Sequence, residues 1–308
     1  MITILGAGGA VSNELVQLLL VHQKPFRLVS RRGGAAPRGA ESMAADLTDR
    51  DQAIRAVAGS RIVFLVIGLP YDHKVWAEMW PKVMANTIEA CKRANAKLVF
   101  FDNVYMYGKV AGAMTEMTPF NPTSRKGEIR AKIAQSLIEE WRFGRQTAMI
   151  ARAADFYGPH TANGMANVLV FDPMSKGEKA MCLASDRMPH SYTYIPDTAP
   201  ALMKLAEAES AWNQTWHLPT APDPPTGRQF IAMTAKAMNK PFEYRVLNRT
   251  MVRVFGWFKP MVGEVREMMY QNDSPYLFDS TKYATAFGFG GTPYDQGIAA
   301  TAESYRAG

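Results

Sequence analysis

Small residues in the first turn of the chain could bring the backbone close to a phosphate group. Residues 6–9 read Gly-Ala-Gly-Gly and lie between the apolar run 2–5 and a run with helical periodicity. A glycine turn from a strand into a helix lets main-chain N–H groups approach a pyrophosphate at the helix N-terminus. Glycine is also common in turns that bind nothing, so the turn alone is weak evidence. The residues expected to hold a dinucleotide are Gly6, Gly8, Gly9, Ala10 and Val11.

The end of the second apolar run indicates which dinucleotide binds. An NAD site normally has an acidic residue there, which binds the ribose hydroxyls. This sequence has Ser30, Arg31 and Arg32 and no acid at that point. Guanidinium groups bind phosphate oxygens in bidentate geometry, so these residues suit a 2′-phosphate. We predict NADP as the cofactor; the alternative is that the two arginines only solvate a loop.

Short β-rich runs that alternate with helical stretches would position these residues. The runs are 2–5, 26–30, 62–67, 97–101 and 147–152. Several are continuously apolar, as strands buried on both faces are, which predicts a doubly wound parallel sheet. We therefore predict an α/β fold with a Rossmann domain over 1–158, rejoined near 190–210. Residues 159–308, rich at first in Pro, Met and aromatic side chains, are expected to form mostly a smaller substrate-binding lobe.

The composition argues against several other classes of protein. The chain has 308 residues, of which 47% are hydrophobic and 20% charged, as in globular proteins. Its two cysteines, Cys91 and Cys182, lack the spacing of a disulfide framework or a metal site. The net charge of +7 comes from scattered Lys and Arg residues, which favours an anionic small molecule over nucleic acid. We expect a cytoplasmic protein with a small-molecule substrate and no membrane partner, and we leave a homodimer open.

Seven motifs occur within residues 1–205. They are GAGGAVS at 6–12, the basic strand end SRR at 30–32, AADLTD at 44–49, VIGLP at 66–70, FFDNVYMYG at 100–108, RAADFYGP at 152–159 and HSYTYIPDTAPAL at 190–202. Together they resemble the extended and atypical branch of the short-chain dehydrogenase/reductase superfamily, in the form labelled NAD-dependent epimerase/dehydratase. The resemblance implies a Rossmann domain with a C-terminal substrate lobe.

The resemblance also implies specific contacts with the cofactor. The family's G-x-x-G-x-x-G pattern is kept at Gly6 and Gly9, whereas Ser12 stands in the third position. By the same comparison, two residues would flank the adenine and three would line the middle of the cofactor. They are Asp46 and Leu47 for the adenine, and Ile67, Gly68 and Leu69 for the middle.

The sequence departs from the family at the catalytic positions. The family has a Ser or Thr shortly before a Tyr-Gly pair, and this chain has Asn103 there, whose amide can still bind a carbonyl. For the family's Tyr-x-x-x-Lys on the following helix, the best match is Glu128 and Lys132, with glutamate in place of the tyrosine. Residues four apart share a helix face, so both could reach the nicotinamide or could form an ordinary surface ion pair.

Another residue would then supply the proton that the family's tyrosine supplies. A carboxylate beside a lysine stays ionised, so we rank Glu128 below a phenol. Tyr105 follows the same strand as Asn103, and Tyr157 follows the next strand at the same edge of the sheet. Of these two tyrosines, we expect Tyr105 to supply the proton.

The sequence therefore predicts an NADP-dependent oxidoreductase that transfers a hydride between nicotinamide and a small carbonyl or alcohol. Asn103 and Tyr105 would contact the reacting oxygen, and Lys132 would hold the ribose. Two alternatives stay open: a sugar-nucleotide epimerase or dehydratase, and a protein that binds NADP(H) without turnover as a regulator or redox sensor.

Overall fold

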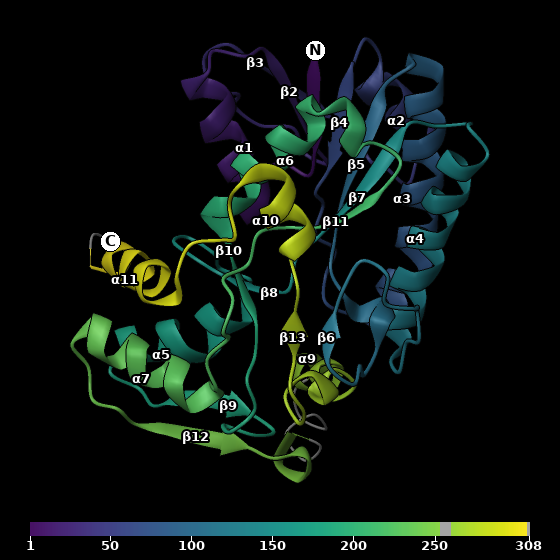
Figure 1. Ribbon diagram of the computed structural model, residues 1–308. Helices are drawn as coiled ribbons and strands as arrows, with labels where there is room; N and C mark the ends of the chain where they lie inside the picture. The colour runs from purple at the N-terminus through teal and green to yellow at the C-terminus, as the bar shows by residue number, and fades with distance from the viewer. Residues whose placement is uncertain (253–259, 307–308) are drawn as a thin grey trace. The chain divides into compact units, whose positions relative to one another are not determined.

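The computed structural model describes residues 1–252 and 260–306, which divide into two compact units (Figure 1). Unit 1 consists of Met1–Met106, Lys126–Arg152 and Thr198–Trp216. Unit 2 consists of Tyr107–Arg125, Ala153–Asp197 and the described residues from His217 onward. The sequence predicts a first domain over 1–158 that the chain rejoins near 190–210. In the structure the chain rejoins unit 1 at 198–216, and residues 107–125 and 153–158 belong to unit 2.

Unit 1 contains a seven-stranded sheet with the order β11-β7-β5-β4-β1-β2-β3. Its strands are β1 (Ile2–Leu5), β2 (Phe26–Ser30), β3 (Ala40–Ala44), β4 (Ile62–Leu65), β5 (Lys97–Asp102), β7 (Ala148–Arg152) and β11 (Thr215–His217). The pairings from β3 through β7 are parallel. Every residue of β1, β4 and β7 is buried, as continuous apolar strands in a covered sheet require. The predicted α/β Rossmann fold is confirmed.

Helices cover both faces of this sheet. They are α1 (Ala10–Val21), α2 (Arg50–Val57), α3 (His73–Ala94), α4 (Arg125–Arg142) and α6 (Thr198–Glu207). Figure 1 shows α2, α3 and α4 on one side of the sheet and α1 and α6 on the other. Side-chain caps fix where two of these helices begin, because Asp49 accepts from the backbone of α2 and Asp72 from that of α3.

Unit 2 is built from three short parallel strand pairs with helices around an aromatic core. The strands are β6 (Ala113–Met114), β8 (Asp155–Tyr157), β9 (Ala180–Leu183), β10 (Tyr192–Tyr194), β12 (Tyr244–Leu247) and β13 (Leu277–Phe278). The helices are α5 (Asp172–Ser175), α7 (Gly227–Met238), α9 (Pro260–Arg266), α10 (Thr281–Phe287) and α11 (Tyr294–Ser304). A capping box of Thr226 and Gln229 starts α7. Within the described residues, no helix combines the length and apolarity needed to cross a bilayer.

A glycine pair offers a test of the backbone geometry. Gly108 and Gly144 have φ of +66° and +63°, a region that L-residues adopt at a cost. A Cβ at Gly144 would meet no atom within 4 Å, whereas one at Gly108 would overlap the carbonyl oxygen of Asn121. We expect Gly144→Ala to lower the free energy of unfolding by about 1–2 kcal/mol. Gly108→Ala should cost about 1–3 kcal/mol more because the backbone must shift. Urea unfolding would measure both, and equal losses would contradict the overlap.

Candidate active site

The glycine turn after β1 leaves the N-terminus of α1 open to a ligand. A Cβ at Gly6, where φ is +118°, would lie 2.7 Å from the backbone of Ile67, so only glycine allows the two loops to meet. Gly8 has φ of +88° and open space where a side chain would stand. Gly9 caps α1 and provides no side-chain hydrogen bond, so the first N–H groups of the helix keep their capacity to bind an anion. The turn therefore fits a pyrophosphate.

Other predicted contacts lie at the same ends of the strands. The N–H groups of Gly6 and Ala7 donate to the carbonyl of Val29 at 2.9 and 3.0 Å, which holds the turn against β2. Ala10 and Val11 form the first turn of α1, and residues 67–69 follow β4 directly. Ser12 is fully buried, so its small side chain occupies the closely packed third position of the glycine pattern.

The basic end of β2 is accessible and faces a second predicted cofactor contact. Arg31 and Arg32 are exposed, and the Ser30 hydroxyl donates to the carbonyl of Gly33 at 3.0 Å. Hydrogen bonds from the Thr48 backbone and hydroxyl lower the pKa of Asp46, and the nearby charge of Arg31 lowers it further. The charge of Arg31 therefore acts on the loop where the adenine half of a dinucleotide is expected.

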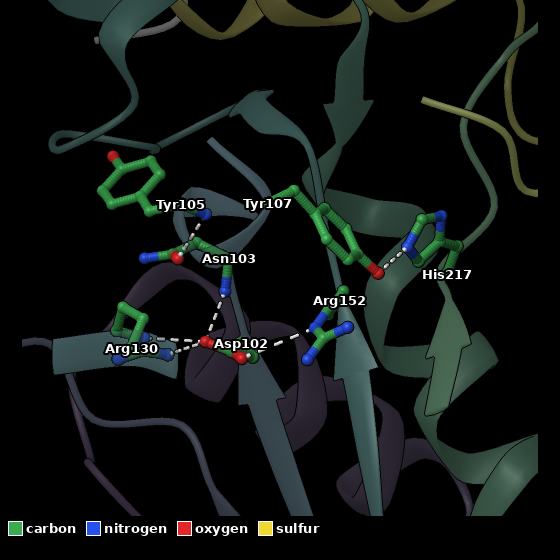
Figure 2. A network of polar contacts seen from close by, with 7 residues as sticks. All are labelled: Asp102, Asn103, Tyr105, Tyr107, Arg130, Arg152 and His217. Carbon is green, nitrogen blue, oxygen red and sulfur yellow. Dashed lines mark hydrogen bonds and ion pairs between the residues drawn. The ribbon is translucent and has the colours of Figure 1, made fainter. Parts of the chain in front are cut away.

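A buried ionic network lies where β5 and β7 end (Figure 2). Asp102 and Arg152 are neighbours in the sheet register, and their side chains form an ion pair at 3.6 Å. Arg130 of α4 donates from Nε to Oδ1 of Asp102 at 2.7 Å, and its Nη2 contacts the same oxygen. All three side chains are at most 4% exposed. The network ties α4 to the ends of two central strands.

Asn103 and Tyr105 are brought together beside this network. The backbone N–H of Asn103 donates to Asp102 Oδ1 at 2.9 Å, and that of Tyr105 donates to Asn103 Oδ1 at 3.1 Å. The Asn103 amide nitrogen has no hydrogen bond among the described residues. Since its oxygen is occupied, the NH₂ group is the part of Asn103 that can donate to a ligand oxygen. Tyr105 is half-buried, and its ring stacks on Trp76 with centroids 6.2 Å apart.

The helix α4 does not bring Glu128 and Lys132 to this site. Both side chains are exposed, and Lys132 lines an outer groove between α3 and α4. The charged residues that α4 buries are Lys126 and Arg130, at 0% and 4% exposure. A shift of two positions rotates a residue by about 200° around a helix, so the two pairs lie on opposite faces. The family's spacing therefore fits Lys126 and Arg130, with lysine in place of tyrosine and arginine in place of lysine.

A signal in the sequence could have identified the buried pair. Ile133, Ala134 and Leu137 form the apolar stripe of α4. Extending that stripe back by three and then four positions gives Arg130 and Lys126. The charges of the two side chains conceal this continuity, because charged residues usually lie on the solvent face of a helix.

Tyr157 lies in the core of unit 2 and is not placed for proton transfer. Its side chain is fully buried and contacts Tyr192, Tyr194, Phe230 and Tyr294. Burial raises the pKa of its phenol well above the ordinary value. The sequence predicts Tyr157 at the same edge of the main sheet as Asn103, because it closely follows the run 147–152. Instead it ends β8, in a different sheet, so we assign it a packing role.

Tyr107 also has a structural role (Figure 2). Its hydroxyl lies 2.9 Å from Nε2 of His217, whose Nδ1 lies 2.7 Å from the carbonyl oxygen of Asp279. A carbonyl only accepts, so Nδ1 carries the hydrogen and Nε2 accepts from Tyr107 in the neutral imidazole. This chain of bonds holds the segment after Met106 within unit 2.

Unit 2 has a small cavity of about 30 Å³ of its own. Its walls are mostly apolar side chains, and its polar lining residues include Asp155, Tyr192 and Asn272. His190 Nε2 lies 3.0 Å from the Asp155 carboxylate. Among the described lining residues there is a carboxylate and neither Lys nor Arg. This charge pattern is the opposite of what a diphosphate group needs.

Comparison with known proteins relates the chain to one family. The family model described as "NAD dependent epimerase/dehydratase family" matches residues 2–217. None of the curated proteins matches the chain.

Solved structures of sugar-nucleotide enzymes are similar to this protein over 99% of its length. The Thermus thermophilus UDP-glucose 4-epimerase complexed with NAD has a TM-score of 0.78, 18% identity and 98% of its chain covered. A Streptomyces venezuelae dTDP-glucose 4,6-dehydratase mutant with NAD bound has a TM-score of 0.82, 14% identity and 97% covered. The Thermotoga maritima UDP-glucose 4-epimerase with UDP-glucose has a TM-score of 0.82, 17% identity and 98% covered. At these identities the likeness shows the fold.

Removing the carboxylate of Asp102 tests the ionic network. We expect Asp102→Ala to lower the free energy of unfolding by about 3–5 kcal/mol, because Arg130 and Arg152 lose a buried counter-charge. The control is Glu89→Ala, which breaks exposed ion pairs with Arg50 and Arg93 and should leave the unfolding midpoint unchanged. Similar midpoints for the two variants in urea unfolding would show that the network does not stabilise unit 1.

Proposed function

Because the chain belongs to the NAD-dependent epimerase/dehydratase family, we propose that it is an enzyme that moves a hydride between a nicotinamide dinucleotide and a carbon bearing oxygen. The observation that carries this proposal is the turn after β1, where Gly6 packs on Ile67 and α1 begins without a side-chain cap. The dinucleotide, when bound, supplies or accepts the hydride. The protein binds the phosphates, orients the substrate and moves the proton.

Asn103 has the geometry to orient a reacting oxygen. Its Oδ1 is fixed by the Tyr105 N–H, and its own backbone is fixed by Asp102. The amide NH₂ therefore has a set direction and can donate to a carbonyl or hydroxyl oxygen.

A sugar-nucleotide epimerase or dehydratase is the form of this chemistry that the comparisons favour. The family model covers 216 of the 308 residues, and the similar structures named above are enzymes of that kind. In such a reaction the hydride that leaves the substrate is returned to it, so the cofactor is regenerated within each cycle.

A second form, net reduction of a small carbonyl by NADPH, is favoured by one feature of this chain. Lys126 is buried where the family has a tyrosine, and an ammonium group is a proton donor in its usual state.

We propose NADP as the cofactor. Arg31 is exposed at the end of β2, and its charge lowers the pKa of Asp46, the residue expected to flank the adenine. Arg32 is exposed next to it. A guanidinium group binds a 2′-phosphate but gains little from a ribose hydroxyl.

Removing the Arg31 side chain tests the cofactor assignment. We expect Arg31→Ala to weaken NADPH binding about 10- to 100-fold, the loss of one charge-assisted hydrogen-bonded contact. NADH binding should change little. Arg38→Ala, in the same exposed loop, is the control and should change neither affinity. Fluorescence titration gives both dissociation constants, and an equal loss for NADPH and NADH would refute the 2′-phosphate role.

Two substrate panels separate the forms of hydride transfer. The first contains UDP-glucose and dTDP-glucose with oxidised cofactor, and the second contains aldehydes, ketones and enones with NADPH. Epimerisation or dehydration is expected to change the sugar, measured by NMR, without net change in cofactor absorbance. Net reduction would instead consume NADPH. Tight cofactor binding without turnover on either panel would contradict the enzyme proposal and favour the sensor.

A further inference from the structure

The two buried cations of α4 differ in the chemistry of their charged groups. Arg130 donates twice to Asp102, and its guanidinium lies 4.3 Å from the ring centroid of Trp80. The same guanidinium lies 5.0 Å from the ring centroid of Phe100. A guanidinium stays protonated in proteins, so Arg130 does not exchange protons and serves as a fixed positive charge.

Lys126 occupies the first turn of α4 and has a different environment. Its side chain is fully buried, and its ammonium lies 4.4 Å from the ring centroid of Tyr71. The Tyr71 ring meets Trp76 edge-on at 5.8 Å, and Trp76 stacks on Tyr105. Lysine has three donors on a flexible stem and gains or loses a proton when its surroundings change. Lys126 is therefore the buried cation of α4 that can do acid–base chemistry.

Tyr105 is less well placed for this role than the sequence suggests. Its ring is held parallel to Trp76, with an interplanar angle of 12°. Figure 2 shows its hydroxyl pointing away from Asp102 and Arg130. The backbone of Tyr105, rather than its phenol, contacts Asn103.

We propose that Lys126 is the catalytic acid and base of this enzyme, in place of a phenol. The inference rests on the proposed function. In the reducing direction the carbonyl carbon receives a hydride from the reduced nicotinamide dinucleotide, and the carbonyl oxygen takes a proton from the Lys126 ammonium. The products are an alcohol, the oxidised dinucleotide and a neutral amine, which regains its proton from solvent. The oxidising direction reverses each transfer. Asn103 donates a hydrogen bond to the same oxygen.

Substitutions at position 126 separate proton exchange from packing. Lys126→Met should lower kcat about 10²- to 10⁴-fold, the usual contribution of a general acid, and change the Kd of NADP(H) less than threefold. Lys126→Arg keeps the positive charge over Tyr71 but cannot exchange a proton, so it should be as slow as Lys126→Met. Lys126→Tyr restores a phenol and should recover activity. The control is Lys132→Met, an exposed lysine of the same helix, which should behave as wild type.

The opposite pattern overturns the inference. Wild-type kcat in Lys126→Met, or recovery in Lys126→Arg without recovery in Lys126→Tyr, would assign Lys126 a structural role. Loss of kcat in Tyr105→Phe, with Lys126→Met unchanged, would return the proton transfer to the phenol.

A binding measurement tests the role of Lys126 independently of turnover. In protein labelled with [ε-¹³C]lysine, the resonance absent from Lys126→Met is that of Lys126. Adding NADP⁺ should shift this resonance and leave the Lys132 resonance in place. If NADP⁺ binds by calorimetry and the Lys126 signal does not move, this inference fails and the proposed function stands. If neither NADP⁺ nor NAD⁺ binds, the proposed function fails instead.

Discussion

The ion pair between Asp102 and Arg130 decides which residues of α4 face the strand ends. Burying a carboxylate and a guanidinium costs several kcal/mol of desolvation for each ion, so the pair is stable only when the groups meet in good geometry. Arg130 meets Asp102 through Nε and Nη2, and aromatic rings surround the guanidinium. Rotating α4 by even one residue, about 100°, would separate the ions. The pair thus fixes the rotation of the helix.

This rotation has chemical consequences because it places Lys126 one turn before Arg130 on the same buried face. The backbone N–H of Asn103 donates to the same carboxylate. Asp102 therefore positions both the end of β5 and the helix α4. Arg152 adds a second cation from β7. One carboxylate therefore joins three elements, and the amide of Asn103 takes its direction from that arrangement.

Features that depend on local chemistry could be predicted from the sequence. Continuous apolar runs predicted the parallel sheet, and the glycines at 6–9 predicted a turn that the close approach of Gly6 to Ile67 explains. The pair on α4 could not be chosen by spacing, since charged residues four apart occur at both 126/130 and 128/132. The burial of Arg130 depends on a partner, Asp102, that is distant in the chain. Tyr157 was misplaced for a similar reason, because the chain leaves the main sheet after Arg152.

Replacing a phenol by an ammonium changes the charge on both sides of the proton transfer. A phenol alternates between neutral and anionic forms, whereas an amine alternates between cationic and neutral forms. Negative charge that develops on a carbonyl oxygen during hydride addition is stabilised by a preorganised cation more than by a neutral donor. In the oxidising direction the neutral amine takes up the proton of the alcohol hydroxyl. The fixed guanidinium and the exchangeable ammonium on one helix face therefore allow the same site to act in both directions.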